Sequence, residues 1–164
     1  MMPEDEVILN LAHRTRKNLV FIDRHQNDPD VEEFTQLLNS MLGMLISLHE
    51  EYFKGNPQVT WEDVSHKPIG NQTIGHVENF SEFIEKLRHA FAHACFDLLG
   101  DPAQSRGEQE IVGIRVWNVS SRTPRPKIRV AKRFWEAILT KEELREITEV
   151  LLDYLERKHG PCKS

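Results

Sequence analysis

Three residues in one short stretch, Arg88, His89 and His93, have side chains that could do chemistry. An imidazole titrates near neutral pH and can take a proton from a ribose 2′-hydroxyl. A guanidinium can hold a phosphate through two hydrogen bonds and stabilise the charge that develops on it. Because His89 and His93 are four residues apart, both imidazoles would project from one face of a helix, as in helical zinc sites. The stretch therefore fits two chemistries, phosphoryl transfer without a metal and metal binding.

The metal hypothesis requires a third ligand from elsewhere, and His13, His49 and Glu85 could each supply it. Two histidines at this spacing also occur often by chance. The sequence has no Cys-based zinc pattern and no Gly-rich phosphate loop. We therefore predict no metal and no cofactor, and keep a metal site on His89 and His93 as an alternative.

Phosphoryl transfer without a metal requires the side chains of Arg88 and His93 to reach the same phosphate. They are five residues apart, which separates them by roughly 140° around a helix axis. One helix therefore cannot bring both side chains to the same phosphate. Two copies of the helix packed face to face could do so, because both chains would supply groups to one cleft. The spacing accordingly favours a homodimer.

The stretch 79–99 predicts a single amphipathic helix that carries all three residues. Asn79 followed by Glu82 is a variant of the capping box, and Gly100 and Pro102 would end the helix. The apolar stripe consists of Phe80, Phe83, Ile84, Leu87, Phe91, Ala94, Cys95 and Leu98. The opposite face consists of His89, Ala92, His93 and Phe96, with Arg88 on its flank. A solvated face would be mostly Lys, Glu and Gln, so we predict that this second face also meets a partner or a cleft.

The other predicted helices share an apolar stripe at helical period and span about 7–25, 31–54 and 140–158. Thr140 and Glu143 form a capping box at the start of the last one. A long connection, 55–77, separates the second predicted helix from the third, and Thr60 can cap a single helical turn around Trp61 within it.

Two strands are expected between the third and the last helix. Alternating and β-branched residues predict a strand over 111–119 and a second over 127–131, joined by a turn with two prolines. We therefore expect a mainly α fold, with one domain over 1–164. It would be an up-and-down helical bundle with a small β-hairpin inserted at about 110–133.

Charge is distributed unevenly along the 164-residue chain. The formal net charge of −5 argues against a protein that coats nucleic acid over its whole surface. The stretch 114–133 nevertheless contains no Asp or Glu. Its basic residues include Arg115, Arg122, Arg125, Lys127 and Arg129. A local basic surface on an acidic protein fits a site for a phosphate-bearing ligand, and a solubilising hairpin is the alternative.

The cellular compartment follows from what the sequence lacks. No apolar run is long enough to span a membrane, and none resembles a signal peptide. Cys95 lies on the apolar stripe and Cys162 in the C-terminal tail, so a disulfide between them is not expected. We expect a cytoplasmic protein with no membrane partner.

The stretch from Arg88 to His93 resembles the motif of the HEPN superfamily, the higher-eukaryote and prokaryote nucleotide-binding domain. That motif has an Arg, four to six residues and a His, with a polar residue directly after the Arg, here His89. In the branch that this chain most resembles, a two-stranded insertion with a Val-Trp-Asn stretch follows, here 116–118. A Trp-containing segment, here 134–136, then leads into the last helix.

This resemblance implies a fold and an activity. Many family members are metal-independent ribonucleases that cut single-stranded RNA at a homodimer cleft and leave a 2′,3′-cyclic phosphate. His93 would then transfer the proton, Arg88 would hold the phosphate, and His89 would orient the site. The basic residues of 114–133 would contact RNA. Such proteins act as toxins, phage-defence effectors or RNA-processing enzymes, so an antitoxin protein is a further expected partner.

Two other interpretations of the motif stay open from the sequence. Some relatives keep the fold and bind nucleotides or partners without cutting, so a non-catalytic binding module is the first alternative. In the second, Arg88 would form a surface ion pair with Glu82 or Glu85, and the two histidines would be polar residues of a plain dimer interface.

Overall fold

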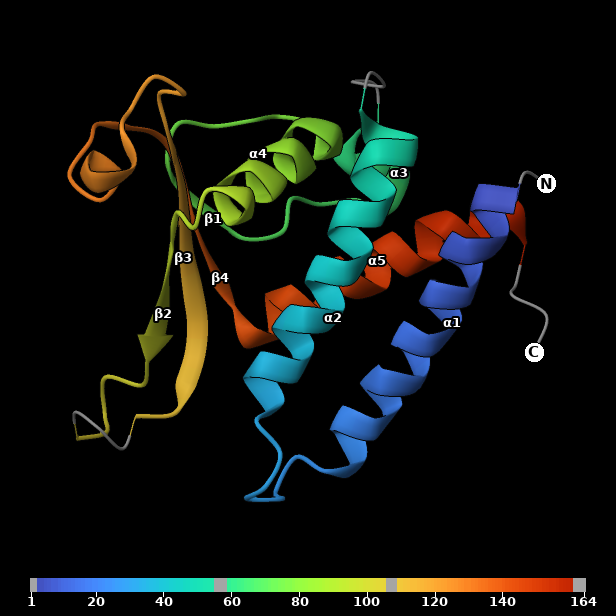
Figure 1. Cartoon of the computed structure of the whole chain (residues 1–164). Coiled ribbons are helices and arrows are strands. Elements are labelled where there is room, and N and C mark those ends of the chain that lie inside the picture. The colour runs from blue at the N-terminus through green and yellow to red at the C-terminus, as the bar shows by residue number, and fades with distance from the viewer. Residues whose placement is uncertain (1–2, 55–58, 106–108, 161–164) are drawn as a thin grey trace.

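The computed structural model describes residues 3–54, 59–105 and 109–160 (Figure 1). Its helices are α1 (Pro3–Arg24), α2 (Glu33–Leu48), α3 (Trp61–Val64), α4 (Phe80–Ala92) and α5 (Lys141–His159). Its strands are β1 (Asn71–Ile74), β2 (Phe96–Gly100), β3 (Ile111–Val119) and β4 (Arg133–Thr140). A π-helical turn, η1 (His49–Phe53), extends α2, and a 3₁₀ turn, η2 (Arg125–Lys127), lies between β3 and β4.

The molecule has a helical side and a sheet side (Figure 1). Helices α1, α2 and α5 pack on one another, and the four strands form an antiparallel sheet in the order β1-β4-β3-β2. Helix α4 lies between these two parts and packs on β3 and on the α2–η1 segment. No helix in the described ranges is long and apolar enough to cross a membrane.

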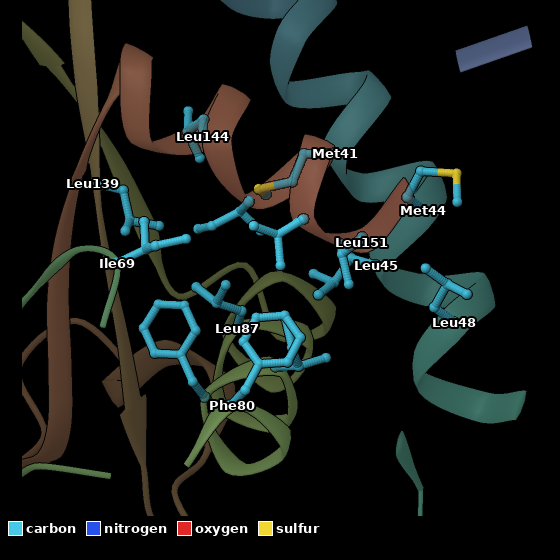
Figure 2. Close-up of a cluster of buried hydrophobic side chains, with 14 of the residues drawn as sticks. Met41, Met44, Leu45, Leu48, Ile69, Phe80, Leu87, Leu139, Leu144 and Leu151 are labelled. Carbon is cyan, nitrogen blue, oxygen red and sulfur yellow. The ribbon is translucent and has the colours of Figure 1, made fainter. Parts of the chain in front are cut away.

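One apolar core joins the two sides. Met41, Leu45 and Leu48 of α2 converge with Phe80 and Leu87 of α4, and all of them are fully buried (Figure 2). The sheet closes the core from the other side through buried residues of β3 and β4. These are Ile114, Val116, Trp135, Ala137 and Leu139. Burial of each large side chain is worth about 1.5–3 kcal/mol, so α4 is held firmly on two faces.

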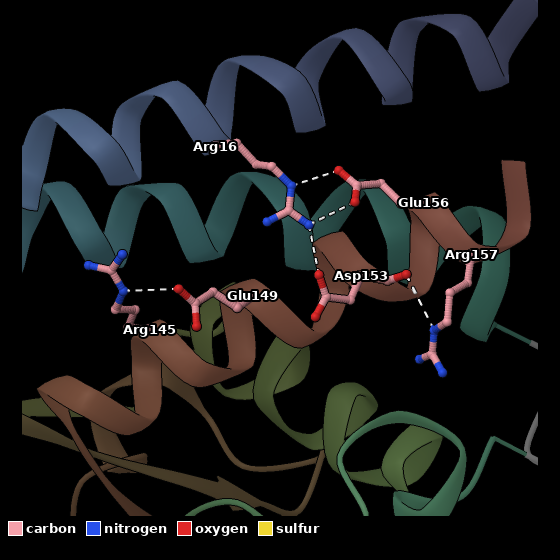
Figure 3. A network of polar contacts seen from close by, with 6 residues as sticks. All are labelled: Arg16, Arg145, Glu149, Asp153, Glu156 and Arg157. Atoms are coloured by element: carbon pink, nitrogen blue, oxygen red, sulfur yellow. Dashed lines mark hydrogen bonds and ion pairs between the residues drawn. The ribbon is translucent and has the colours of Figure 1, made fainter. Parts of the chain in front are cut away.

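Charged side chains fix how α1 lies along α5. The Arg16 guanidinium donates to Glu156, with Nε 2.6 Å from Oε1, and to Asp153, with Nη2 2.7 Å from Oδ1 (Figure 3). Arg145 of α5 likewise pairs with Asp23 near the end of α1. Because these pairs are partly exposed, each contributes only on the order of 1 kcal/mol. They select the alignment of two helices that the core already holds together.

The prediction of one helix over 79–99 is correct for its first part and wrong for its end. The Asn79 side chain caps the Glu82 N–H at 2.8 Å, as predicted. The helix, however, ends at Ala92. Ala94 takes a left-handed conformation with φ of 54°. The N–H of Ala94 then donates to Phe91 O, and that of Cys95 donates to Ala90 O at 2.8 Å. This pair of bonds is a Schellman motif, which redirects the chain into β2.

The early end of α4 changes the surroundings of the predicted stripe. Phe96 and Leu98, placed on helical faces by the sequence, lie instead on strand β2. The Leu98 side chain is 50% exposed rather than part of the core. Helical period continues through 96–99 in the sequence, but only the pairing of β2 with β3 shows that a strand forms there.

The expected mainly α bundle with a small hairpin is only partly correct, because the fold is a mixed one with a four-stranded antiparallel sheet. Strand 111–119 is confirmed as β3. The predicted strand 127–131 is wrong, since that stretch begins in η2 and β4 starts at Arg133. Pro124 and Pro126 explain the shift, because proline fixes φ and has no N–H for a sheet. Strands β1 and β2 were not predicted.

The remaining helical predictions agree with the structure. The helices expected over 7–25 and 31–54 correspond to α1 and to α2 with η1. Thr60 caps the single turn α3, and Thr140 with Glu143 forms the capping box of α5. Within the expected connection, 55–58 lie outside the described residues, as does Cys162; Cys95 is a buried free thiol.

Substituting Ala94 tests the turn that ends α4. An L-residue in the left-handed region is strained and glycine is not, so Ala94→Gly should raise the free energy of unfolding by about 0.5–1 kcal/mol. Ala92→Gly is the matched control, and it should lower stability by about 0.5–1 kcal/mol because Ala92 is helical. Urea unfolding measures both. A loss of stability in Ala94→Gly equal to that in Ala92→Gly would contradict the turn.

Candidate functional site

The end of α4 carries all three residues of the predicted motif. Arg88 and His89 lie in its last turns and are partly buried. His93 is the C-cap residue, and its N–H donates to His89 O at 3.2 Å. Ala92, His93 and Ala94 are all exposed, so His93 is flanked on both sides by small side chains. The motif therefore sits at a helix end that another molecule can approach closely.

Two hollows flank the helix end, and His89 lines both. We call the first the histidine pocket, about 40 Å³ in volume. It is lined by His89, His93, Cys95, Asn118, Val119, Ser120, Ser121, Thr123 and Ile128. We call the second the arginine groove, about 320 Å³ in volume. It is lined by His49, Phe53, Lys54, Ser81, Glu82, Glu85, Arg88 and His89.

Arg88 and His93 face different hollows. Arg88 lines the arginine groove and His93 the histidine pocket. This separation is what their five-residue spacing predicts. Glu82 and Glu85, the carboxylates considered as partners of Arg88, line the same groove as Arg88. Within one chain the guanidinium and the exposed imidazole are therefore not brought to a common point.

The two imidazoles lie side by side. The ring centroids of His89 and His93 are 4.5 Å apart, with an angle of 44° between the ring planes. Burial lowers the pKa of His89, and the nearby positive charges of His93 and Arg88 lower it further. His89 is therefore predominantly neutral at neutral pH and can both donate and accept a hydrogen bond.

The structure does not assemble the alternative metal site. No group of three His, Cys, Asp or Glu side chains that could hold a metal ion occurs among the described residues. Two of the proposed third ligands, His49 and Glu85, line the arginine groove, on the side of His89 away from His93. His13 lines a groove on the surface of α1 instead.

The basic stretch divides into two groups. Arg122, Arg125 and Lys127 are exposed in the connection between β3 and β4. Four other residues of this connection line the histidine pocket, namely Ser120, Ser121, Thr123 and Ile128. The remaining two predicted RNA-binding residues, Arg129 and Arg115, are engaged in ion pairs. Arg129 Nη1 lies 2.6 Å from Asp97 Oδ1, and Arg115 Nε lies 3.9 Å from Glu136 Oε1.

Asn118 is a residue of the candidate site for which no role was predicted from the sequence. Its side chain is buried, and Nδ2 donates to the Lys86 carbonyl of α4 at 2.9 Å. This hydrogen bond ties β3 to the helix two residues before Arg88. Asn118 also lines the histidine pocket. The available signal is a polar residue at a core-facing position of β3, where its neighbours Ile114 and Val116 are apolar.

The family model described as HEPN pEK499 p136 matches residues 1–161. The chain therefore belongs to this HEPN family, and its predicted membership in the HEPN superfamily is confirmed. No curated protein and no solved structure matches the chain.

The lowered pKa of His89 has a consequence for stability. The unfolded chain takes up a proton near the ordinary histidine pKa of about 6.5, whereas folded His89 takes it up only at lower pH. Stability should therefore fall as pH decreases below that value. Urea unfolding across pH 7 to 5 should show a smaller loss in His89→Gln than in wild type. His76→Gln, at an exposed histidine, is the control, and an unchanged pH profile in His89→Gln would refute the assignment.

The hydrogen bond from Asn118 to α4 can be tested by removing it. Asn118→Leu keeps the size of the side chain but leaves the Lys86 carbonyl without this donor. The expected loss in the free energy of unfolding is about 1–3 kcal/mol. In NMR spectra, the backbone amides of Arg88 and His89 should shift more than those at the start of α4. If only β3 amides shift, Asn118 does not position the helix end.

Proposed function

We propose that this protein is a metal-independent RNA endonuclease that acts as a homodimer. Its membership in a HEPN family points to a nuclease or nucleotide-binding role. The single observation that carries the proposal is the placement of Arg88 and His93 in separate hollows at an exposed helix end. Within one chain the phosphate-binding and the proton-transfer groups lie apart, and a second copy would bring Arg88 of one chain together with His93 of the other.

The exposed surface at Ala92, His93 and Ala94 supports this arrangement. Most homodimers have two-fold symmetry, so a contact made by one chain is repeated by the other. Small side chains on both sides of His93 allow two helix ends to approach closely. His93 of one chain can then meet Arg88 of its partner, and the symmetry generates the same pair a second time.

The proposed reaction is an attack of the ribose 2′-oxygen on the adjacent phosphorus. The His93 imidazole takes the 2′-hydroxyl proton while the new oxygen–phosphorus bond forms. The bond from phosphorus to the 5′-oxygen of the next nucleotide breaks, and that oxygen leaves with a proton from water or from an imidazolium. The product ends are a 2′,3′-cyclic phosphate and a 5′-hydroxyl. Arg88 stabilises the charge on the phosphorane oxygens.

His89 has a supporting role in this proposal. Its neutral imidazole lies between Arg88 and His93 and lines both hollows. It can therefore orient the phosphate or the His93 ring by a hydrogen bond. Arg122, Arg125 and Lys127 are exposed on the connection that helps to line the histidine pocket, and they would attract the RNA backbone. Arg115 and Arg129 would add to this surface from within their ion pairs.

A cellular ribonuclease of this kind needs restraint, since uncontrolled RNA cleavage is harmful. We therefore propose a toxin or phage-defence role in the cytoplasm, with an antitoxin protein as the partner that blocks the cleft. A binding module that holds a nucleotide or RNA in the same cleft, without cleavage, is the alternative outcome of the test below.

The test is RNA cleavage with a chelator present and with analysis of the product ends. Wild type should produce 2′,3′-cyclic phosphate ends, and His93→Ala should lower the rate by about 10²–10⁴-fold. Lys67→Ala is the control, because Lys67 is exposed and lines neither the histidine pocket nor the arginine groove. No cleavage by wild type, together with retained RNA binding, would establish the binding module. Activity that only a metal restores would establish the metal site.

A mixing experiment tests the composite cleft. Arg88→Ala and His93→Ala should each be inactive as homodimers. If the site combines Arg88 of one chain with His93 of the other, each mixed dimer has one intact site. Subunit exchange should then restore roughly a quarter of wild-type activity, because half of the dimers are mixed and each has one of two sites. If the mixture stays inactive although mass spectrometry detects mixed dimers, each site belongs to one chain.

A further inference from the structure

The C-terminal half of α1 carries a shallow groove on its exposed side, which we call the α1 groove. Its volume is about 550 Å³, within the range of ligand sites. It is lined by His13, Arg16, Lys17, Val20, Phe21, Arg24 and His25. Helix α1 lies beyond α2 and α5 from the sheet (Figure 1). The α1 groove is therefore a different surface from the helix end that carries His93.

Phe21 and His25 form an aromatic platform in this groove. Their rings stack with centroids 4.0 Å apart and an angle of 24° between the planes. The His25 Nδ1–H donates to the Phe21 carbonyl at 2.8 Å, which fixes the imidazole against the phenyl ring. Phe21 is nevertheless 44% exposed, and the neighbouring Val20 is 46% exposed. A flat apolar surface is thus held rigid and open to solvent.

Cations lie on both sides of the platform. Lys17 precedes Phe21 by one helical turn and Arg24 follows it by slightly less than one turn, and both are exposed. Arg16 is held by Glu156 and Asp153, as Figure 3 shows. Among the described residues no carboxylate is paired with Lys17 or Arg24. On a chain of net charge −5, this is a local positive surface.

We propose that the α1 groove binds a segment of single-stranded nucleic acid. One base stacks on Phe21, and the phosphates on either side of that nucleotide contact Lys17 and Arg24. Aromatic platforms beside cations are the common means of holding single strands, because every base has a flat face and every linkage has a negative charge. An Asp or Glu side chain would satisfy the cations but has no flat ring to stack on the platform, whereas every nucleotide carries both a phosphate and a ring. The binding does not depend on cleavage.

The probe is a fluorescently labelled tetradeoxythymidylate, which lacks the 2′-hydroxyl needed for the proposed cleavage and therefore remains intact. In NMR titrations of the full chain, the Phe21 and His25 ring signals should shift on addition of the probe. Phe21→Ala should weaken binding by about 5- to 100-fold, and Phe21→Trp should retain it. Val7→Ala is the matched control, since Val7 is 70% exposed on the same helix but outside the groove.

Reversing the charge of the two groove cations is the second part of the binding experiment. Lys17→Glu and Arg24→Glu should each weaken binding and reduce its dependence on salt. Arg14→Glu is the matched control, because Arg14 is exposed on α1 without lining the groove. Equal weakening by Arg14→Glu, or full affinity in Phe21→Ala, would overturn the proposal in favour of general electrostatic attraction.

Two measurements exclude other occupants of the groove. If sedimentation shows that Phe21→Ala converts a dimer to a monomer, the groove is an interface between copies and the proposal fails. If a polyglutamate peptide binds as tightly as the nucleotide probe, with the same dependence on Phe21, the ligand is an acidic protein segment and the proposal also fails. The peptide outcome leaves the proposed ribonuclease activity untouched, since that activity is measured with RNA at the other surface. The monomer outcome would also count against a dimer formed through the α4 helix ends, and the mixing experiment with Arg88→Ala and His93→Ala tests that dimer separately.

Discussion

The left-handed turn at Ala94 is the constraint on which the candidate site depends. It ends α4, closes two hydrogen bonds back to Ala90 and Phe91, and sends the chain into β2. If the helix continued, as its apolar period suggests, His93 would lie in mid-helix and β2 would not exist. The turn instead leaves His93 exposed at a helix end, beside a pocket formed by β3 and the connection that follows it.

The sequence predicted the elements whose signals are local. The cap at Thr60 identified the start of α3, the capping box at Thr140 identified the start of α5, and alternation identified β3 with its correct ends. Strand β2 was missed because residues 96–99 continue the helical period, and the turn before it uses Ala rather than Gly. Strand β1 is short and mostly exposed, so it has no apolar pattern of its own. Strand β2 forms by pairing with β3, and β1 forms by pairing with β4. These partners are distant in the sequence, so no local pattern predicts either strand.

The candidate site divides in the same way. The separation of Arg88 from His93 follows from helical spacing alone, so it could be predicted. The pocket around His93 could not, because Asn118 and the β3–β4 connection reach it only through the pairing of distant strands. The ion pairs of Arg115 with Glu136 and of Arg129 with Asp97 could not be predicted either, because their partners are distant in the sequence. Charge along the sequence therefore overstated how many of these cations are available to a ligand.

The two histidines at the end of α4 differ in burial, since His89 is partly buried and His93 is exposed. Positive charge on His93, at a ring-centroid distance of 4.5 Å, and on Arg88 opposes protonation of His89. Partial burial lowers the pKa of His89, whereas His93 is exposed to solvent and to any substrate. The fold thus keeps His89 predominantly neutral between the two hollows and leaves His93 exposed, which fits the proposal that His93 transfers the proton.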